Sequence, residues 1–207
     1  MPEYVFRIAA FLLLLVYRVI RKVWERRLAA HLTQRPTMER RPIRERWLLG
    51  VMGVLMVPTL LYCMSTWVDF AHVPLPEWSR WTGAVITVGG IWLFSLTHTA
   101  LAQNWSPLLE VREGNTLITS GPYHLVRHPM YSAGLVVNIG ISLLCANWLA
   151  ATGLIAGLLI VVGFRVRDEE RMMIDAFGDE YRAYMARTGR LLPKLGYLLR
   201  LQNRNDR

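Results

Sequence analysis

The chain alternates long apolar stretches with short polar segments, and the lengths of the apolar stretches predict its class. Trp47 to Trp67 is a run of 21 residues without a formal charge, about the length that an α-helix needs to cross a bilayer. Trp81 to Leu101 is a second such run. Val5 to Ile20 is shorter and is interrupted only by Arg7 and Arg18, whose long side chains can reach the membrane interface. These three segments are predicted membrane spans.

A longer apolar stretch, Ser132 to Phe164, is interrupted by the pair Asn147-Trp148. Its 33 residues are too few for two full-length spans and a turn, because each arm would have about 16 residues where about 20 are needed. The pattern predicts a tight hairpin of two short helices, either shallow or accompanied by local thinning of the bilayer. Gly153 and Gly157 predict close packing of the second arm. The predicted fold is therefore all-α and integral to the membrane, with about five transmembrane helices.

Basic residues are unevenly distributed between these spans, and this asymmetry predicts the orientation. Nine of the Lys/Arg residues lie between Arg21 and Arg46, in a chain of net charge +9. By the positive-inside rule this segment is cytoplasmic, which places the N-terminus outside and the C-terminus inside. The segment could also bind anionic lipid head groups, although topology alone explains it. Because the arginines flank apolar spans and do not cover a soluble face, nucleic-acid binding is not expected.

The whole chain is expected to form a single membrane domain. Residues 1–101 hold the three N-terminal spans, and residues 102–207 hold the polar motifs and the hairpin. Tyr181 and Tyr184 stand at helical spacing, and Pro193 ends the pattern. This predicts an amphipathic C-terminal cap on the cytosolic face.

The polar segment best suited to chemistry is Gly121 to Tyr131, between the third span and the hairpin. It contains Arg127 and His128, and its two prolines, Pro122 and Pro129, disfavour the α conformation in the residue before each. Irregular backbone at membrane depth must be buried in protein or line a polar cavity. The segment is therefore a candidate site.

A second polar group follows the hairpin and consists of Arg165, Glu169 and Glu170. If the last helix continues beyond Phe164, Arg165 and Glu169 stand at i and i+4 on one face. Taken alone, this pair could be a surface salt bridge worth about 0.3–0.5 kcal/mol, and Arg127 could be one more positive-inside residue. Their joint position at the inner ends of adjacent spans favours a site.

The order and spacing of these motifs resemble the isoprenylcysteine carboxyl methyltransferase family. The resemblance covers about half of the chain and rests on Gly-x-Tyr at 121–123, Arg-His-Pro-x-Tyr at 127–131, Arg-x-x-x-Glu-Glu at 165–170 and Phe-Gly-x-x-Tyr at 177–181. It implies an integral membrane enzyme that methylates with S-adenosylmethionine and that would lie in the inner or plasma membrane if the protein is bacterial. It also implies a site facing the cytoplasm and a lateral entrance for a lipophilic acceptor.

The resemblance also implies roles for individual residues. The family's arginine at the position of Arg165 faces the prenylcysteine carboxylate, so Arg165 is expected to orient the acceptor. Glu169 is expected to meet the cationic end of the cofactor, and His128 its carboxylate or ribose. Asn115 stands where the family usually has histidine, so no contact is carried over there. The other residues expected at the cofactor are Leu117, Ile118, Tyr123, Arg127, Pro129, Tyr131 and Glu170.

No metal site is expected. His98 lies in a polar cluster near the inner end of the third span, but no second histidine stands three or four positions away, so a histidine packed between helices is expected. Cys63 and Cys145 lie inside apolar stretches, where a thiol behaves as a small hydrophobe.

Two other functions stay open from the sequence. Membrane sterol reductases share the Arg-His-Pro-x-Tyr turn, which would make this an NADPH-dependent reductase, although the short chain and the Glu169-Glu170 pair argue against that. A non-catalytic membrane component is the other alternative. The acceptor is also open: a lipid, a small thiol or a small carboxylate fits as well as prenylcysteine.

Overall fold

A computed structural model gives the arrangement of the chain and describes residues 1–31, 38–39, 42–101, 110–111 and 116–194. Its elements are the helices α1 (Glu3–His31), α2 (Pro42–Met64), α3 (Glu77–Leu101), α4 (Pro129–Cys145) and α5 (Trp148–Arg187), the short 3-10 turns η1 (Asp69–Ala71) and η3 (Gly121–His124), and two-residue strands β1 (Met38–Glu39) and β2 (Glu110–Val111). The strands pair antiparallel, with Met38 opposite Val111. The helical class predicted from the sequence is confirmed.

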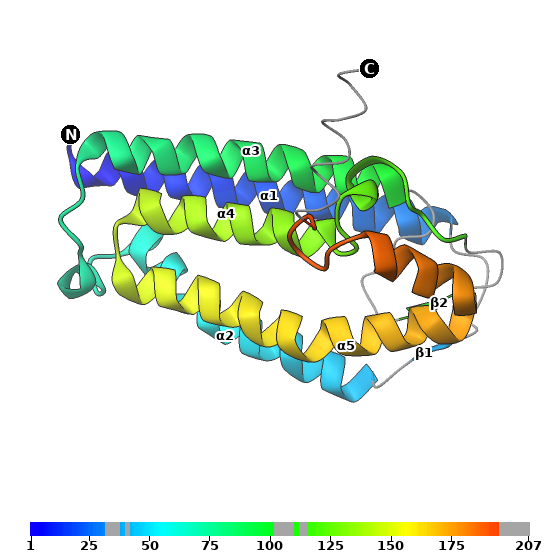
Figure 1. Cartoon of the computed structure of the whole chain (residues 1–207). Helices are drawn as coiled ribbons and strands as arrows, with labels where there is room; N and C mark the ends of the chain where they lie inside the picture. The colour runs from blue at the N-terminus through cyan, green and yellow to red at the C-terminus, as the bar shows by residue number, and fades with distance from the viewer. Residues whose placement is uncertain (32–37, 40–41, 102–109, 112–115, 195–207) are drawn as a thin grey trace, which may run out of the picture.

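The long helices run roughly along one direction in two groups (Figure 1). α1, α3 and α4 pack together, and α5 lies between α4 and α2. Three stretches in the described part are long and apolar enough to cross a membrane, namely Arg46–Met64 within α2, α3 and α5. α4 is apolar but has only 17 residues. Full crossing by α1 and α4 therefore stays a prediction.

The predicted hairpin turn is present, but its two arms differ in length. α4 ends at Cys145, Ala146 adopts a left-handed conformation with φ 47°, and the Asn147 side chain accepts a hydrogen bond from the Ala150 N–H at 3.0 Å. α5 then runs for 40 residues, with a kink at Gly178. The prediction of two short helices was wrong for the second arm, because the charged residues after Phe164 are good helix formers and continue the helix beyond the apolar stretch.

Small residues bring the helices close together. A Cβ atom at Gly83 of α3 would lie 2.6 Å from the Gly140 carbonyl oxygen of α4. On α5, a Cβ atom at Gly153 would overlap with the Leu55 carbonyl of α2. The close packing predicted for the Gly153 and Gly157 face is confirmed, and its partner is α2.

Arg80 joins several helices near the end of the bundle that carries the N-terminus. Its side chain is 5% exposed and donates to both carboxylate oxygens of Glu3 at 2.7 and 2.8 Å, and to the Leu144 carbonyl at 3.0 Å. Tyr62 also donates to Glu3, at 2.7 Å. This network ties α1, α2 and α3 to the end of α4, at the opposite end of the bundle from the Arg127-His128 turn.

His98 and the cysteines have the structural roles expected of them. His98 is fully buried, with Nδ1 2.9 Å from the Phe94 carbonyl oxygen, and its ring lies against those of Phe94 and Trp24. Cys63 and Cys145 form no disulfide, and Cys145 is buried.

Candidate functional site

The Arg127-His128 turn leads directly into α4. His128 has a non-helical conformation with φ −124° and ψ 59°, as expected for the residue before a proline. Pro129 occupies the first helical position, where its missing N–H has no helical partner to lose. The backbone N–H groups of Arg127 and His128 donate to the carbonyls of Gly189 and Arg190, at 2.8 and 3.0 Å. The segment after α5 thus holds the turn in place.

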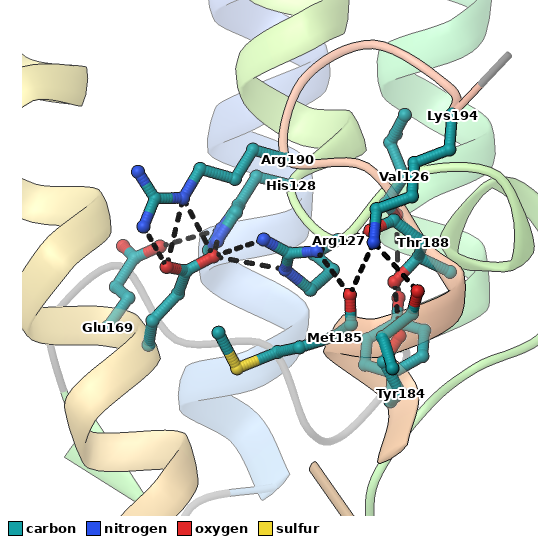
Figure 2. A network of polar contacts seen from close by, with 11 residues as sticks. Val126, Arg127, His128, Glu169, Tyr184, Met185, Thr188, Arg190 and Lys194 are labelled. Carbon is teal, nitrogen blue, oxygen red and sulfur yellow. Dashed lines mark hydrogen bonds and ion pairs between the residues drawn. The ribbon is translucent and has the colours of Figure 1, made fainter. Parts of the chain in front are cut away.

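Glu170 of α5 is the centre of a buried ionic cluster beside this turn. Arg127 donates to its Oε1 from Nε at 3.0 Å and from Nη2 at 2.9 Å. Arg190 donates to its Oε2 from Nε at 3.0 Å and from Nη2 at 2.6 Å. Figure 2 shows both arginines reaching this part of α5 from different segments. A carboxylate only 5% exposed needs such charged partners to stay ionised away from water.

Glu169 forms a second group of contacts beside the first. The Tyr131 hydroxyl donates to its Oε1 at 2.7 Å, and Arg165 Nε lies 2.9 Å from the same oxygen. His128 Nδ1 lies 3.2 Å from its other oxygen. The predicted i, i+4 relation of Arg165 and Glu169 is confirmed, because α5 continues beyond the apolar stretch.

His128 lies between the two carboxylates and is 8% exposed. Its Nε2 is 3.5 Å from Glu170 Oε1, which is too long for a good hydrogen bond, and it has no hydrogen-bond partner in the part of the chain that the structure describes. Burial disfavours the charged imidazole, but the contacts with Glu169 and Glu170 outweigh burial and raise the pKa of His128. The two carboxylates therefore favour the charged imidazole, and Nε2 is left without a close hydrogen-bond partner among the described residues.

The remaining expected residues differ in burial and in how they relate to this cluster. Tyr123 is buried in η3, its carbonyl accepts from the Tyr184 hydroxyl at 2.5 Å, and burial, with smaller effects of Glu169 and Tyr184, raises the pKa of its phenol. Leu117 and Ile118 are half-buried in the segment leading to η3 and take no part in the polar contacts above. Asn115 lies outside the described residues.

Sequence reasoning missed Arg190, and it interpreted Arg44 only as a topology signal. Arg44 of α2 forms an ion pair with Asp168, whose side chain is 7% exposed. A signal for a second basic partner did exist. Adjacent residues on a helix point in different directions, so Arg165 could not serve both Glu169 and Glu170. The sequence could not show which arginine would be the partner of Glu170.

Positive charge exceeds negative charge in this cluster. The described cluster contains three arginines, Arg127, Arg165 and Arg190, against two glutamates, Glu169 and Glu170. One positive charge is left over before His128 is counted, and His128 adds to it when protonated. Such a group attracts an anionic ligand.

Comparison with known proteins relates this cluster to a family. The family model described as phospholipid methyltransferase matches residues 78–180. Protein-S-isoprenylcysteine O-methyltransferase of Mus musculus is 30% identical over 141 residues, which cover 63% of this chain and 49% of that protein. The chain belongs to the isoprenylcysteine carboxyl methyltransferase family of membrane proteins. The family model and the mouse protein are named as methyltransferases, so the comparison does not favour the alternative of an NADPH-dependent reductase.

Other members and relatives extend the comparison. Cobalt-zinc-cadmium resistance protein CzcN of Cupriavidus metallidurans is 32% identical over 124 residues, covering 56% of this chain and 55% of that protein. A solved structure of the eukaryotic intramembrane Ras methyltransferase isoprenylcysteine carboxyl methyltransferase shares the fold, with a TM-score of 0.52 and 20% identity over 76% of this chain and 54% of that one. The chain thus spans about half the length of the family members it matches.

Proposed function

We propose that this protein is a membrane-embedded methyltransferase that uses S-adenosylmethionine and methylates a carboxylate on a lipophilic acceptor. The observation that carries the proposal is the excess of positive charge where the Arg127-His128 turn meets α5, at the end of a membrane helix bundle. The arginines and His128 there can donate charge-assisted hydrogen bonds to a carboxylate that arrives from the lipid phase, whereas an apolar span offers no such donors. The site faces the cytoplasm if the basic segment between α1 and α2 does.

The donor set fits the cofactor. S-adenosylmethionine supplies an electrophilic methyl group when bound, and it carries a sulfonium, an ammonium and a carboxylate. His128 Nε2, buried and without a hydrogen-bond partner among the described residues, can donate to a carboxylate or ribose oxygen. Glu169 can attract the cationic end. The other residues proposed to line the cofactor site are Leu117, Ile118, Tyr123, Arg127, Pro129, Tyr131 and Glu170.

Arg165 is proposed to orient the acceptor. Its side chain is 11% exposed and is positioned by Glu169 one helical turn away. A guanidinium can hold a carboxylate with two parallel hydrogen bonds, which fixes the direction of the attacking oxygen. A carboxylate is already nucleophilic when ionised, so positioning and exclusion of water supply most of the acceleration and no strong base is required.

The nature of the acceptor is a narrower proposal. The mouse relative is named for methylation of isoprenylcysteine, whereas CzcN is named for metal resistance. A prenylcysteine-like carboxylate is the first acceptor to test, and a short-chain lipid and a small thiol are the next. The first two share the requirement that the reacting group reaches Arg165 while the rest of the molecule stays in the membrane.

The test is a titration of the purified full chain in detergent with S-adenosylmethionine and, separately, with NADPH. A ligand that binds only the folded state adds about 2.7 kcal/mol to the free energy of unfolding at a hundredfold excess over Kd, and so raises the midpoint of thermal unfolding. We expect stabilisation by S-adenosylmethionine alone, followed by transfer of a labelled methyl group to a farnesylated cysteine analogue. Stabilisation by NADPH alone would overturn the proposal, and stabilisation by neither would favour a non-catalytic component.

A further inference from the structure

Arg190 contacts the site through both its side chain and its backbone. Its guanidinium donates to Glu170 three times, at 2.6, 3.0 and 3.2 Å, and its carbonyl accepts from the His128 N–H at 3.0 Å. Figure 2 shows it approaching from the segment after α5. It lies outside residues 78–180, the part matched by the family model.

The contacts of Glu170 determine which atoms are left for a ligand. Arg127 and Arg190 together place five hydrogen bonds on its two oxygens, and an ionised carboxylate has about four lone-pair sites. His128 Nε2, at 3.5 Å from Oε1, is the buried donor that this arrangement leaves out. The two arginines therefore compete with the imidazole for the same carboxylate.

We propose that Arg190 is a positioning residue: by holding Glu170 against Arg127, it keeps this carboxylate off His128 Nε2 and leaves that nitrogen to donate to a carboxylate of the bound ligand. The identity of the ligand rests on the proposed function, whereas the competition for Glu170 does not. Arg190 touches neither cofactor nor acceptor in this mechanism and acts only through Glu170 and His128.

Removing the guanidinium has a definite electrostatic consequence. Glu170 loses one of its two cations and can turn its freed oxygen toward His128 Nε2, where an imidazolium would complete its charge compensation. The nitrogen is then occupied by protein and unavailable to a ligand. The charged and titratable groups that face His128 are Glu169 and Glu170 of α5, Tyr131 of α4, Arg127 of the same turn and Arg190, with Arg165 acting through Glu169.

A purely structural role for Arg190 predicts something different. Gly189 and Arg190 hold the turn through backbone hydrogen bonds that a change of side chain leaves in place. Loss of the Arg190 charge alone raises the pKa of a nearby imidazole, whereas Arg190→Lys keeps the charge and loses only the fork. If the side chain only fastened this segment, Arg190→Lys would lower the unfolding temperature but would not change the protonation of His128. Protonation of His128 is therefore the discriminating measurement.

The experiment is an NMR titration of the full chain in micelles with isotopically labelled histidine, with the His128 signal assigned by its loss in His128→Gln. We expect Arg190→Gln to raise the pKa of His128 by about one unit. Arg190→Lys should raise it less, because lysine keeps the charge but loses the fork. Arg182→Gln, which removes an exposed guanidinium paired with Asp179, is the matched control and should change nothing. An unchanged pKa of His128 in Arg190→Lys overturns the proposal, because that variant keeps the charge and removes only the fork that holds Glu170.

Calorimetry with S-adenosylmethionine tests whether the effect of Arg190 on His128 also changes ligand binding. Arg190→Gln should weaken binding about tenfold, the size of one lost charge-assisted hydrogen bond, and Arg182→Gln should not. A raised His128 pKa with unchanged affinity would overturn the link between the freed nitrogen and the ligand. If the wild type binds no S-adenosylmethionine, the proposed function fails, while the NMR titration still decides whether Arg190 controls His128.

Discussion

Arg165 and Glu169 lie one turn apart on α5, with Arg165 Nε 2.9 Å from Glu169 Oε1. On an exposed helix such a pair would contribute little, but here both side chains are largely buried beside His128 and Tyr131. The same carboxylate thus orients an arginine and contacts a histidine. This arrangement separates two roles that substitutions can test one at a time.

Arg165→Lys should separate binding from chemistry. Lysine keeps the positive charge but cannot hold a carboxylate with two parallel hydrogen bonds, so we expect methyl transfer to fall about a hundredfold or more while the Kd for S-adenosylmethionine changes little. Turnover with a farnesylated cysteine analogue and calorimetry measure the two effects. Arg167→Lys, at an exposed position of the same helix, is the control. Equal losses of binding and turnover would place Arg165 in the cofactor site.

His128→Ala and Glu169→Ala should each weaken S-adenosylmethionine binding about tenfold or more. The reason is the loss of a charge-assisted hydrogen bond in a site from which water is largely excluded. His124→Ala removes an exposed imidazole four residues earlier and should leave the Kd unchanged. Calorimetry that showed wild-type affinity in both site variants would disprove the cofactor assignment.

His128 should make stability depend on pH in a definite direction. Its pKa is raised in the folded state, so its ion pairs contribute fully below its ordinary value of 6.5 and are lost as pH rises through the raised value. Between about pH 6 and about pH 9, we expect the thermal unfolding midpoint to fall more in the wild type than in His128→Gln. Parallel curves for the two proteins would show that the imidazole is not held as a cation.

Gly153→Ala should destabilise the packing of α5 on α2. The added Cβ atom would overlap with the Leu55 carbonyl, and a backbone atom cannot move aside as a side chain can. We expect a loss of about 1–3 kcal/mol in the free energy of unfolding, measured in mixed micelles. Gly163→Ala is the matched control, because its Cβ would meet nothing within 4 Å and the gain in helix propensity is the same. Equal effects of the two substitutions would contradict the close α2–α5 contact.

The orientation is tested by labelling single cysteines with a maleimide that does not cross membranes, after Cys63 and Cys145 are replaced. The side chain of Asp179 is 98% exposed near the site, and Phe70 is 75% exposed near the hairpin turn. We expect a cysteine at Phe70 to react in intact cells and one at Asp179 to react only after permeabilisation. The reverse pattern would place the site outside the cytoplasm.

Local patterns in the sequence predicted much of the helical framework and one part of the site. Apolar length identified α2 and α3, the pair Asn147-Trp148 marked the hairpin turn, and helical periodicity placed Arg165 beside Glu169. These inferences succeed because each depends on residues within one turn or one helix of each other.

The long-range ion pairs were beyond such reasoning. Arg190 meets Glu170 across 20 residues, Arg80 meets Glu3 across 77, and Arg44 meets Asp168 across 124. With 24 Lys/Arg in the chain, a buried carboxylate has many possible partners, and only the packing of the helices selects one. The length of α5 was missed for a related reason, since hydropathy marks where a helix is apolar and not where it ends.

The hydrogen bonds between the Arg127-His128 turn and the segment after α5 also impose an order on biosynthesis. Arg127 contacts the Thr188 carbonyl, 61 residues later in the chain. Translation at roughly 5–20 residues per second leaves the turn without these partners for several seconds, while α4 and the apolar part of α5 are already available for insertion. Both helices of the hairpin are therefore synthesised before the ionic cluster can close, and the cluster stays incomplete until the segment around Arg190 has emerged.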